Sequence, residues 1–329
     1  MHKLVLVGAG RIGRIHAGNI AAHPRLQLAG VVDPVADAAG ALAREHGAAV
    51  LGLDEALADP SVAGIVIASS TDTHLDYSLR AAAAGKAVFC EKPIDLDLAR
   101  ARAAAPTLAR ARLVLGFNRR FDPDFSALKA RLDACAVGRL ESLQITSNDP
   151  APPPPGYVAV SGGLFKDMAI HDFDMARWLL GEEPVEVFAM ASCLVDPEIG
   201  KLGDVDTART LLRTAGGRLC VISNSRRSGF GYDQRIEAYA SGGMLRVDNA
   251  TATTVQAWSE QGAQADAFRN FFLDRYAAAY RIEMAHFADV LDGAAPSVGY
   301  ADGVAALALA EAAAQSLAEG RPVLVAALT

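Results

Sequence analysis

Residues 4–13, Leu4-Val5-Leu6-Val7-Gly8-Ala9-Gly10-Arg11-Ile12-Gly13, decide the fold of the N-terminal part of the chain. The apolar run 4–7 predicts a buried strand, and a helical pattern follows from residue 11 through Ile20. Between them, glycines at GxGxxG spacing permit a tight turn and a close approach of the backbone to a pyrophosphate at the helix N-terminus. The next predicted strand, 28–32, ends at Asp33, an acid about 20 residues further on. This context predicts a dinucleotide-binding domain.

Asp33 indicates which dinucleotide is bound. A carboxylate at this strand end accepts hydrogen bonds from the ribose hydroxyls and repels a 2′-phosphate. The following residues, 34–36, supply no arginine to neutralise that repulsion, so we expect NAD and not NADP. The residues expected to contact the cofactor are Gly8, Gly10, Arg11, Ile12, Gly13, Asp33, Ser69, Thr71, His74, Glu91 and Lys92.

Short apolar runs alternate with helical patterns through the first third of the chain, which is typical of a parallel α/β sheet. Further strands are predicted at 65–68, 87–90 and 113–116, and helices at 74–84 and about 95–109. We therefore expect a Rossmann NAD-binding domain over residues 1–118 and a second domain, for substrate binding and oligomerisation, over 119–329.

The second part of the chain has strands separated by glycine turns. A helix is predicted at 121–136, and a stiff proline loop at 149–156. The glycine pairs in 215–217 and 241–243 indicate hairpins. The predicted strands are 140–147, 185–194, 207–214, 218–225, 235–240, 244–247 and 253–258, and the predicted closing helices are 275–291 and 301–318. This pattern predicts an α+β domain with a large open, mostly antiparallel sheet.

Composition excludes several classes of function. The chain has 329 residues and a net charge of −7 with interspersed signs, so no basic stripe suggests nucleic acid. No apolar run approaches the roughly 18 residues of a membrane span, and a strand follows residues 1–3 directly, which argues against a signal peptide. The four cysteines form no CxxC pair, so we expect reduced thiols, no metal and a cytoplasmic protein.

Residues 162–174 carry the groups best suited to proton transfer. If this segment is one helix, Asp167, His171 and Asp174 fall at i, i+4 and i+7 on a single face. A carboxylate that orients an imidazole is suited to moving a proton near neutral pH. The alternative is an amphipathic helix whose histidine is only solvated or hydrogen-bonded.

Lys92 follows the predicted strand 87–90, at the carboxyl edge where doubly wound sheets bind their ligands. Its neighbours are mostly apolar, so we expect a partly desolvated ammonium that can hold a substrate hydroxyl and stabilise negative charge. The alternative is an ion pair with Glu91 in a loop.

Taken together, the glycine fingerprint, Glu91-Lys92-Pro93 and Asp167…His171 resemble the glucose-fructose oxidoreductase/inositol dehydrogenase/rhizopine-catabolism superfamily. Segments 116–123, 146–150, 161–177 and 224–235 resemble its bacterial inositol 2-dehydrogenase branch, so the similarity covers essentially the whole chain. The resemblance implies a Rossmann domain, a C-terminal domain with a large open sheet, and a homotetramer packed sheet to sheet.

The resemblance also implies an activity and residue roles. The activity is NAD-dependent oxidation of the C2 hydroxyl of myo-inositol to 2-keto-myo-inositol (scyllo-inosose), with hydride passing to NAD. His171 would be the general base, Asp167 would orient it, and Lys92 would bind the reacting oxygen. The implied pocket residues are Arg120, Asp149 and Tyr232.

Two positions depart from the pattern of the resembling enzymes. Asn148 stands where they usually carry arginine, and Phe230 where they often have an aromatic hydroxyl. Both changes remove a donor, so the preferred isomer and ring position stay open. An aldose or another inositol is the main alternative, a non-catalytic NAD-sensing regulator is a remote one, and Arg119 with Arg120 could clamp a hydroxy acid.

Overall fold

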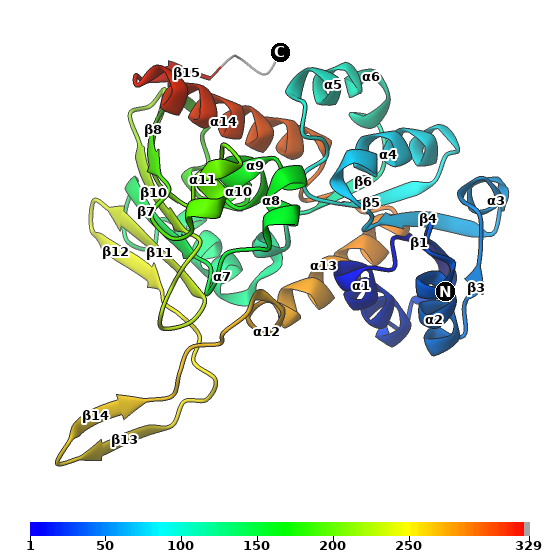
Figure 1. Cartoon of the computed structure of the whole chain (residues 1–329), viewed down its shortest axis with the longest axis horizontal. Helices are drawn as coiled ribbons and strands as arrows, with labels where there is room; N and C mark the ends of the chain where they lie inside the picture. The colour runs from blue at the N-terminus through cyan, green and yellow to red at the C-terminus, as the bar shows by residue number, and fades with distance from the viewer. Residues whose placement is uncertain (326–329) are drawn as a thin grey trace. The chain divides into compact units, whose positions relative to one another are not determined.

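The computed structural model describes residues 1–325, which form two compact units (Figure 1). Unit 1 comprises Met1–Phe121 and Ala279–Leu307, and unit 2 comprises Asp122–Ala278 and the residues from Ala308 onward. Segment 279–307 therefore groups with the N-terminal residues, although it follows the second unit's sheet in the sequence. The domain limits 1–118 and 119–329 stay a prediction.

Unit 1 is built on a six-stranded parallel sheet. Its strands are β1 His2–Val7, β2 Leu26–Val32, β3 Ala49–Val50, β4 Val62–Ile67, β5 Ala87–Glu91 and β6 Leu113–Gly116. The order β3-β2-β1-β4-β5-β6 reverses direction at β1, as in doubly wound nucleotide-binding folds. The apolar runs are buried, because helices cover both faces of such a sheet. The predicted Rossmann fold is confirmed.

One of the helices predicted for unit 1 differs from its prediction. They are α1 Arg11–Ala22, α2 Ala36–His46, α3 Leu53–Ala58, η1 Thr71–Thr73, α4 His74–Ala83, α5 Leu98–Ala103, α6 Ala105–Leu108 and η2 Asn118–Phe121. The single helix predicted over 95–109 is wrong. The carboxylate of Asp97 caps α5 by accepting the amides of Ala99 and Arg100, which delays the start of that helix. Pro106 then lies in the first turn of α6, where its missing N–H is tolerated.

Unit 2 is built on a mixed seven-stranded sheet in the order β12-β11-β7-β10-β9-β8-β15. Its strands are β7 Leu140–Asn148, β8 Pro184–Ser192, β9 Thr207–Thr214, β10 Leu219–Ser225, β11 Asp233–Ala240, β12 Gly243–Val247 and β15 Val323–Leu324. β7 and β10 are parallel, and the other neighbours are antiparallel. Both predicted glycine hairpins, β9–β10 and β11–β12, are confirmed.

One strand of unit 2 is placed differently from its prediction. The segment predicted as a strand over 253–258 instead contributes β13 Gln256–Ser259, which pairs with β14 Gly262–Ala265 outside the large sheet. Every residue of this hairpin is exposed, and it projects from the rest of unit 2 (Figure 1). Because neither face of this hairpin is buried, no apolar face specified a pairing with the large sheet.

Three helices of unit 2 begin at a proline, α7, α8 and α11. The helices are α7 Pro123–Asp133, α8 Pro155–Ser161, α9 Gly163–Asp167, α10 Ile170–Leu180, α11 Pro197–Lys201 and α12 Phe272–Arg275, while α13 Ala277–Leu291 and α14 Tyr300–Glu319 have residues in both units. The predicted proline loop therefore ends earlier than expected, because Pro155 starts α8. Among residues 1–325, no helix has the length and apolar character that crossing a membrane requires.

Candidate active site

The three fingerprint glycines meet different surroundings in unit 1. A Cβ on Gly8 would lie 2.4 Å from the carbonyl oxygen of Ala68, and one on Gly13 would lie 1.9 Å from that of Gly8. Both glycines are therefore required by close backbone packing. A Cβ on Gly10 would meet no atom within 4 Å. The space beside Gly10 is open, which fits a backbone that a pyrophosphate approaches.

The N-terminus of α1 is suited to an anion. Its N-cap is Gly10, which offers no side-chain cap, and the first turn holds no acidic residue. The first amides of a helix lack partners within the helix, and the helix dipole favours negative charge there. Arg11 and Ile12 supply the first of these amides, so the predicted phosphate contacts have the required chemistry.

Asp33 lies at the end of β2 and ties the glycine loop to it. Its Oδ2 accepts the Ala9 amide at 2.7 Å, and its Oδ1 accepts the Val35 amide at 2.8 Å. A carboxylate has about four acceptor sites, so it can still accept ribose hydroxyls. The residues of this end of the sheet therefore fit NAD.

His74 supports the neighbouring loops. Its Nδ1 lies 2.7 Å from the carbonyl oxygen of Pro93, and its Nε2 lies 3.2 Å from that of Ser69. Ser69 and Thr73 share a hydrogen bond of 2.6 Å between their hydroxyls. Burial lowers the pKa of His74, with hydrogen bonds to the two carbonyls opposing the shift. The shorter contact assigns the proton to Nδ1, and the imidazole links the ends of β4 and β5.

Lys92 directly follows β5 and is half-buried, and its peptide bond to Pro93 is cis. The preceding carboxylate of Glu91 does not face solvent in the loop: its Oε1 lies 2.7 Å from Nε2 of the buried His16. The residue before Lys92 is thus anchored within unit 1.

The continuous helix predicted over residues 162–174 is wrong. The structure has α9 ending at Asp167 and α10 beginning at Ile170. At the junction the Ala169 amide bonds to the carbonyl of Leu164, five residues back, and the His171 amide bonds to Met168, three residues back. This change of hydrogen-bond register interrupts the helix, so Asp167 and His171 lie on separate helices.

Asp167 is held by two side chains of unit 2. The Tyr157 hydroxyl donates to its Oδ1 at 2.8 Å, and the buried Arg226 guanidinium approaches its Oδ2 at 3.4 and 3.5 Å. Arg226 also lies 3.9 Å from Asp204. The phenol and the guanidinium both donate to the carboxylate and fix its position. Sequence reasoning gave neither Tyr157 nor Arg226 a role.

Strand pairing brings several predicted site residues together where the central strands β7, β10 and β11 of unit 2 end or begin. Asn148, the last residue of β7, pairs with Asp233, the first residue of β11. Asp149 and Tyr232, the next residues outward, therefore lie at the same end of these two strands. Asn148 also pairs with Ser225 of β10, and the Asp149 amide bonds to the Ser225 carbonyl at 2.9 Å. Tyr232 packs edge-on against Tyr276, and β10 continues directly into Arg226.

Arg120 belongs to unit 1 and already has a carboxylate partner there. Its guanidinium lies 2.8 Å from Asp302 and also reaches the carbonyl of Ser297. An arginine that is paired in this way is poorly suited to clamp a second carboxylate.

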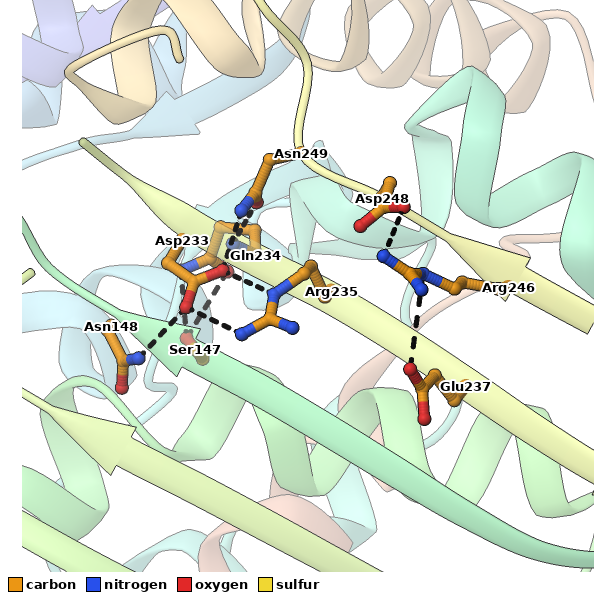
Figure 2. A network of polar contacts seen from close by, with 9 residues as sticks. All are labelled: Ser147, Asn148, Asp233, Gln234, Arg235, Glu237, Arg246, Asp248 and Asn249. Carbon is orange, nitrogen blue, oxygen red and sulfur yellow. Dashed lines mark hydrogen bonds and ion pairs between the residues drawn. The ribbon is translucent and has the colours of Figure 1, made fainter. Parts of the chain in front are cut away.

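Asn148 belongs to a polar network that Figure 2 shows around Asp233. Its side-chain amide donates to Asp233 at 3.1 Å, while Arg235 and Asn249 donate to the same carboxylate at 2.7 and 2.6 Å. Burial alone raises the pKa of Asp233, but the hydrogen bonds from Arg235 and Asn249 outweigh it and lower that pKa. The side-chain amide of Asn148, the neighbour of the predicted pocket residue Asp149, therefore already donates a hydrogen bond to Asp233.

The chain is similar to curated proteins over nearly its full length. It is 45% identical over 324 residues to the inositol 2-dehydrogenase of Rhizobium meliloti and 45% identical over 326 residues to the myo-inositol 2-dehydrogenase of Thermotoga maritima. Each alignment covers 98% of this chain and 98% of the relative.

Solved structures give the same result. A myo-inositol dehydrogenase from Corynebacterium glutamicum superposes with a TM-score of 0.95 at 46% identity, covering 99% of both chains. A scyllo-inositol dehydrogenase from Lactobacillus casei, solved with NAD(H) and scyllo-inositol, gives 0.90 at 28% identity over 99% of this chain and 100% of that one.

Residues 2–118 match the oxidoreductase family with an NAD-binding Rossmann fold, and residues 125–246 match the GFO/IDH/MocA C-terminal domain. These matches agree with the glycine loop, the Asp33 carboxylate and the two sheets described above. The chain belongs to the GFO/IDH/MocA family of NAD-dependent oxidoreductases.

Proposed function

We propose that this protein oxidises myo-inositol at its C2 hydroxyl to 2-keto-myo-inositol with NAD as acceptor. One observation carries the proposal. Lys92 and the pair Asp167 and His171 are all present in a chain that matches inositol 2-dehydrogenases over 98% of its length. A sensor that had lost catalysis would have no need to retain these groups together.

The chemistry needs a proton acceptor and a hydride acceptor. A bound NAD would supply the hydride acceptor for C2. Neutral His171 takes the proton of the C2 hydroxyl, so the alcohol loses two electrons and two hydrogens and becomes a ketone. The Lys92 ammonium stabilises the negative charge that grows on the oxygen. Asp167, held by Tyr157 and Arg226, orients the imidazole and stabilises its protonated form.

An uncharged polyol suits these residues better than a hydroxy acid does. Asp149 and Asp167 would both repel a substrate carboxylate, whereas either can accept hydrogen bonds from hydroxyl groups. Arg120, a possible carboxylate clamp, is paired with Asp302. The second candidate function is oxidation of another inositol isomer or of an aldose. The similar Lactobacillus casei enzyme, solved with scyllo-inositol, supports this alternative.

A panel of substrates with NAD tests this proposal. We expect myo-inositol to give the highest kcat/KM among myo-, scyllo- and D-chiro-inositol, glucose, xylose, galactose and lactate. The reason is that a pocket of paired polar groups discriminates against an isomer that leaves a buried donor unsatisfied. Reduced-nicotinamide absorbance measures each rate. A clear preference for an aldose, or for scyllo-inositol with myo-inositol inert, would contradict the proposal, and inactivity on every polyol would favour a regulator.

Exchange of Asp33 tests the cofactor assignment. Wild-type enzyme should strongly prefer NAD, and the double substitution Asp33→Ser with Pro34→Arg should reduce that preference. The serine removes the like charge that opposes a 2′-phosphate, and the arginine supplies a partner for it. The measurement is the ratio of kcat/KM for NAD and NADP. Equal or faster wild-type turnover with NADP would refute this role of Asp33.

We also propose a homotetramer that packs through the open face of the unit 2 sheet and works in the cytoplasm. That face exposes large apolar side chains, Met190, Leu211, Leu219, Tyr239 and Met244. An exposed sheet face that carries several large apolar side chains commonly marks an interface. The four cysteines are free thiols, which suits a reducing compartment. A monomer in mass photometry at micromolar concentration would contradict the assembly.

A further inference from the structure

Three ionisable side chains from distant parts of the sequence meet inside unit 1. They are His16 of α1, Glu91 at the end of β5 and Glu283 of α13. One ring nitrogen of the histidine and one carboxyl oxygen of each glutamate lie within 4.8 Å of one another. His16 and Glu283 are completely buried. Within the described part of the chain, neither carboxyl oxygen of Glu283 has a hydrogen-bond partner. Such a group requires an explanation, because an isolated buried carboxylate is strongly disfavoured.

The surrounding backbone makes room for the Glu91 carboxylate. Glu91 pairs with Gly116 of β6, and a Cβ on Gly116 would lie 3.0 Å from Oε2 of Glu91. On the other side, the His16 ring packs edge-on against Phe89 and Tyr280, with centroid distances of 4.9 and 5.9 Å. The carboxylate of Glu91 is thus held between the backbone of Gly116 on one side and the His16 ring on the other.

The surroundings of Glu283 favour its neutral form. Burial raises the pKa of Glu283 well above its ordinary value, and the negative charge of Glu91 adds to the shift. Glu283 is therefore a neutral acid, which has an O–H to donate. Nε2 of His16 lies 2.7 Å from Oε1 of Glu91, and Nδ1 of His16 has no partner among the described residues.

We propose that Glu283 is a positioning residue: its buried carboxyl group lies within 4.8 Å of Glu91 and His16, and with them it fixes the strand end from which Lys92 extends. Lys92 is the next residue in the chain, and the carbonyl of Pro93 beyond it is held by His74. The turn is therefore anchored on both sides of Lys92. This inference rests on the proposed function of Lys92 in catalysis.

Two substitutions of Glu283 separate positioning from simple packing. Glu283→Gln keeps a neutral donor of the same shape, and we expect its kcat with NAD and myo-inositol to stay within about threefold of wild type. Glu283→Met removes the polar group but fills the space, and kcat should fall about tenfold to hundredfold, the range for a polar interaction lost beside a charged group. KM for myo-inositol should change less than kcat. Glu45→Gln, an exposed acid of unit 1, is the control for lost charge.

A second readout needs neither cofactor nor substrate. A buried acid with a raised pKa keeps its proton in the folded state and loses it on unfolding above about pH 4.3. Relative to Glu283→Gln, the wild-type unfolding equilibrium constant should therefore rise by up to about tenfold per pH unit above pH 5, for as long as the folded protein keeps this proton. The two proteins should agree near pH 4. The other ionisable groups in this cluster, His16 and Glu91, are common to both proteins.

The outcomes are distinct. Glu283→Met with wild-type kcat, or Glu283→Gln as impaired as Glu283→Met, would overturn the positioning role. A difference in urea unfolding between the two proteins that does not change with pH would show that Glu283 is not neutral in the folded state. One equivalent of tightly bound metal, detected by mass spectrometry of the purified protein, would show the same. If no polyol reacts, the proposed function fails while the unfolding experiment still decides the state of Glu283.

Discussion

Replacing His171 with alanine is expected to lower kcat by about 10²–10⁴-fold while the affinity for NAD stays nearly unchanged. The substitution removes the proton acceptor and leaves unit 1, with its glycine loop and Asp33, untouched. Steady-state kinetics measure the first effect, and titration of NADH fluorescence measures the second. Activity of the wild-type enzyme should also rise with pH, because only the neutral imidazole accepts a proton. This rise should be absent from the residual activity of His171→Ala.

Lys92→Ala is expected to lower kcat at least as much. The loss in the Lys92→Ala/His171→Ala double variant should fall well short of the product of the single losses, because groups that act as a unit are not additive. His46→Ala removes a histidine of α2 with no assigned role and serves as the control. Near-normal turnover of His171→Ala would return the histidine to a purely structural role.

Local patterns were sufficient for the fold of unit 1. The glycine loop, the acid after β2 and the apolar run Leu113–Gly116 are signals carried by neighbouring residues, and the structure confirms the strands that they predict. Strand Thr207–Thr214 was predicted to the residue, because its apolar and polar side chains alternate and one face is buried. The break between α9 and α10 was missed because no proline marks it.

The supporting contacts of the site could not be predicted, because they join residues far apart in the sequence. Arg226 reaches Asp167 from a strand end, and Glu283 reaches Glu91 from a helix that follows the whole second sheet. His16 did give a local signal, since it shares the buried face of α1 with Gly13, Ala17 and Ile20. A buried polar residue on an apolar helix face implies a partner, but the sequence does not say which one.

Unit 2 contains a buried ion pair, and we expect the removal of one of its two partners to lower the free energy of unfolding strongly. Arg275 donates to both oxygens of Asp122 and stacks over the Tyr276 ring, with its guanidinium carbon 4.9 Å from the ring centroid. Asp122 in turn caps α7 by accepting the amides of Asp124 and Phe125. Burial by itself lowers the pKa of Arg275, but the hydrogen bond and charge of Asp122 outweigh it and raise that pKa. Both partners are almost fully buried.

Arg275→Met should therefore lower the free energy of unfolding by about 3–5 kcal/mol, because it leaves the buried Asp122 carboxylate without its cation. Adding Asp122→Asn to Arg275→Met should recover much of that loss, since the amide keeps a cap and carries no charge. Urea unfolding measures each value, and the fluorescence of Trp178 in α10 reports on unit 2. Arg321→Met, which breaks an exposed pair with Glu319, should cost less than about 1 kcal/mol. If Arg275→Met matched Arg321→Met, the Asp122 pair would contribute no more than a surface contact.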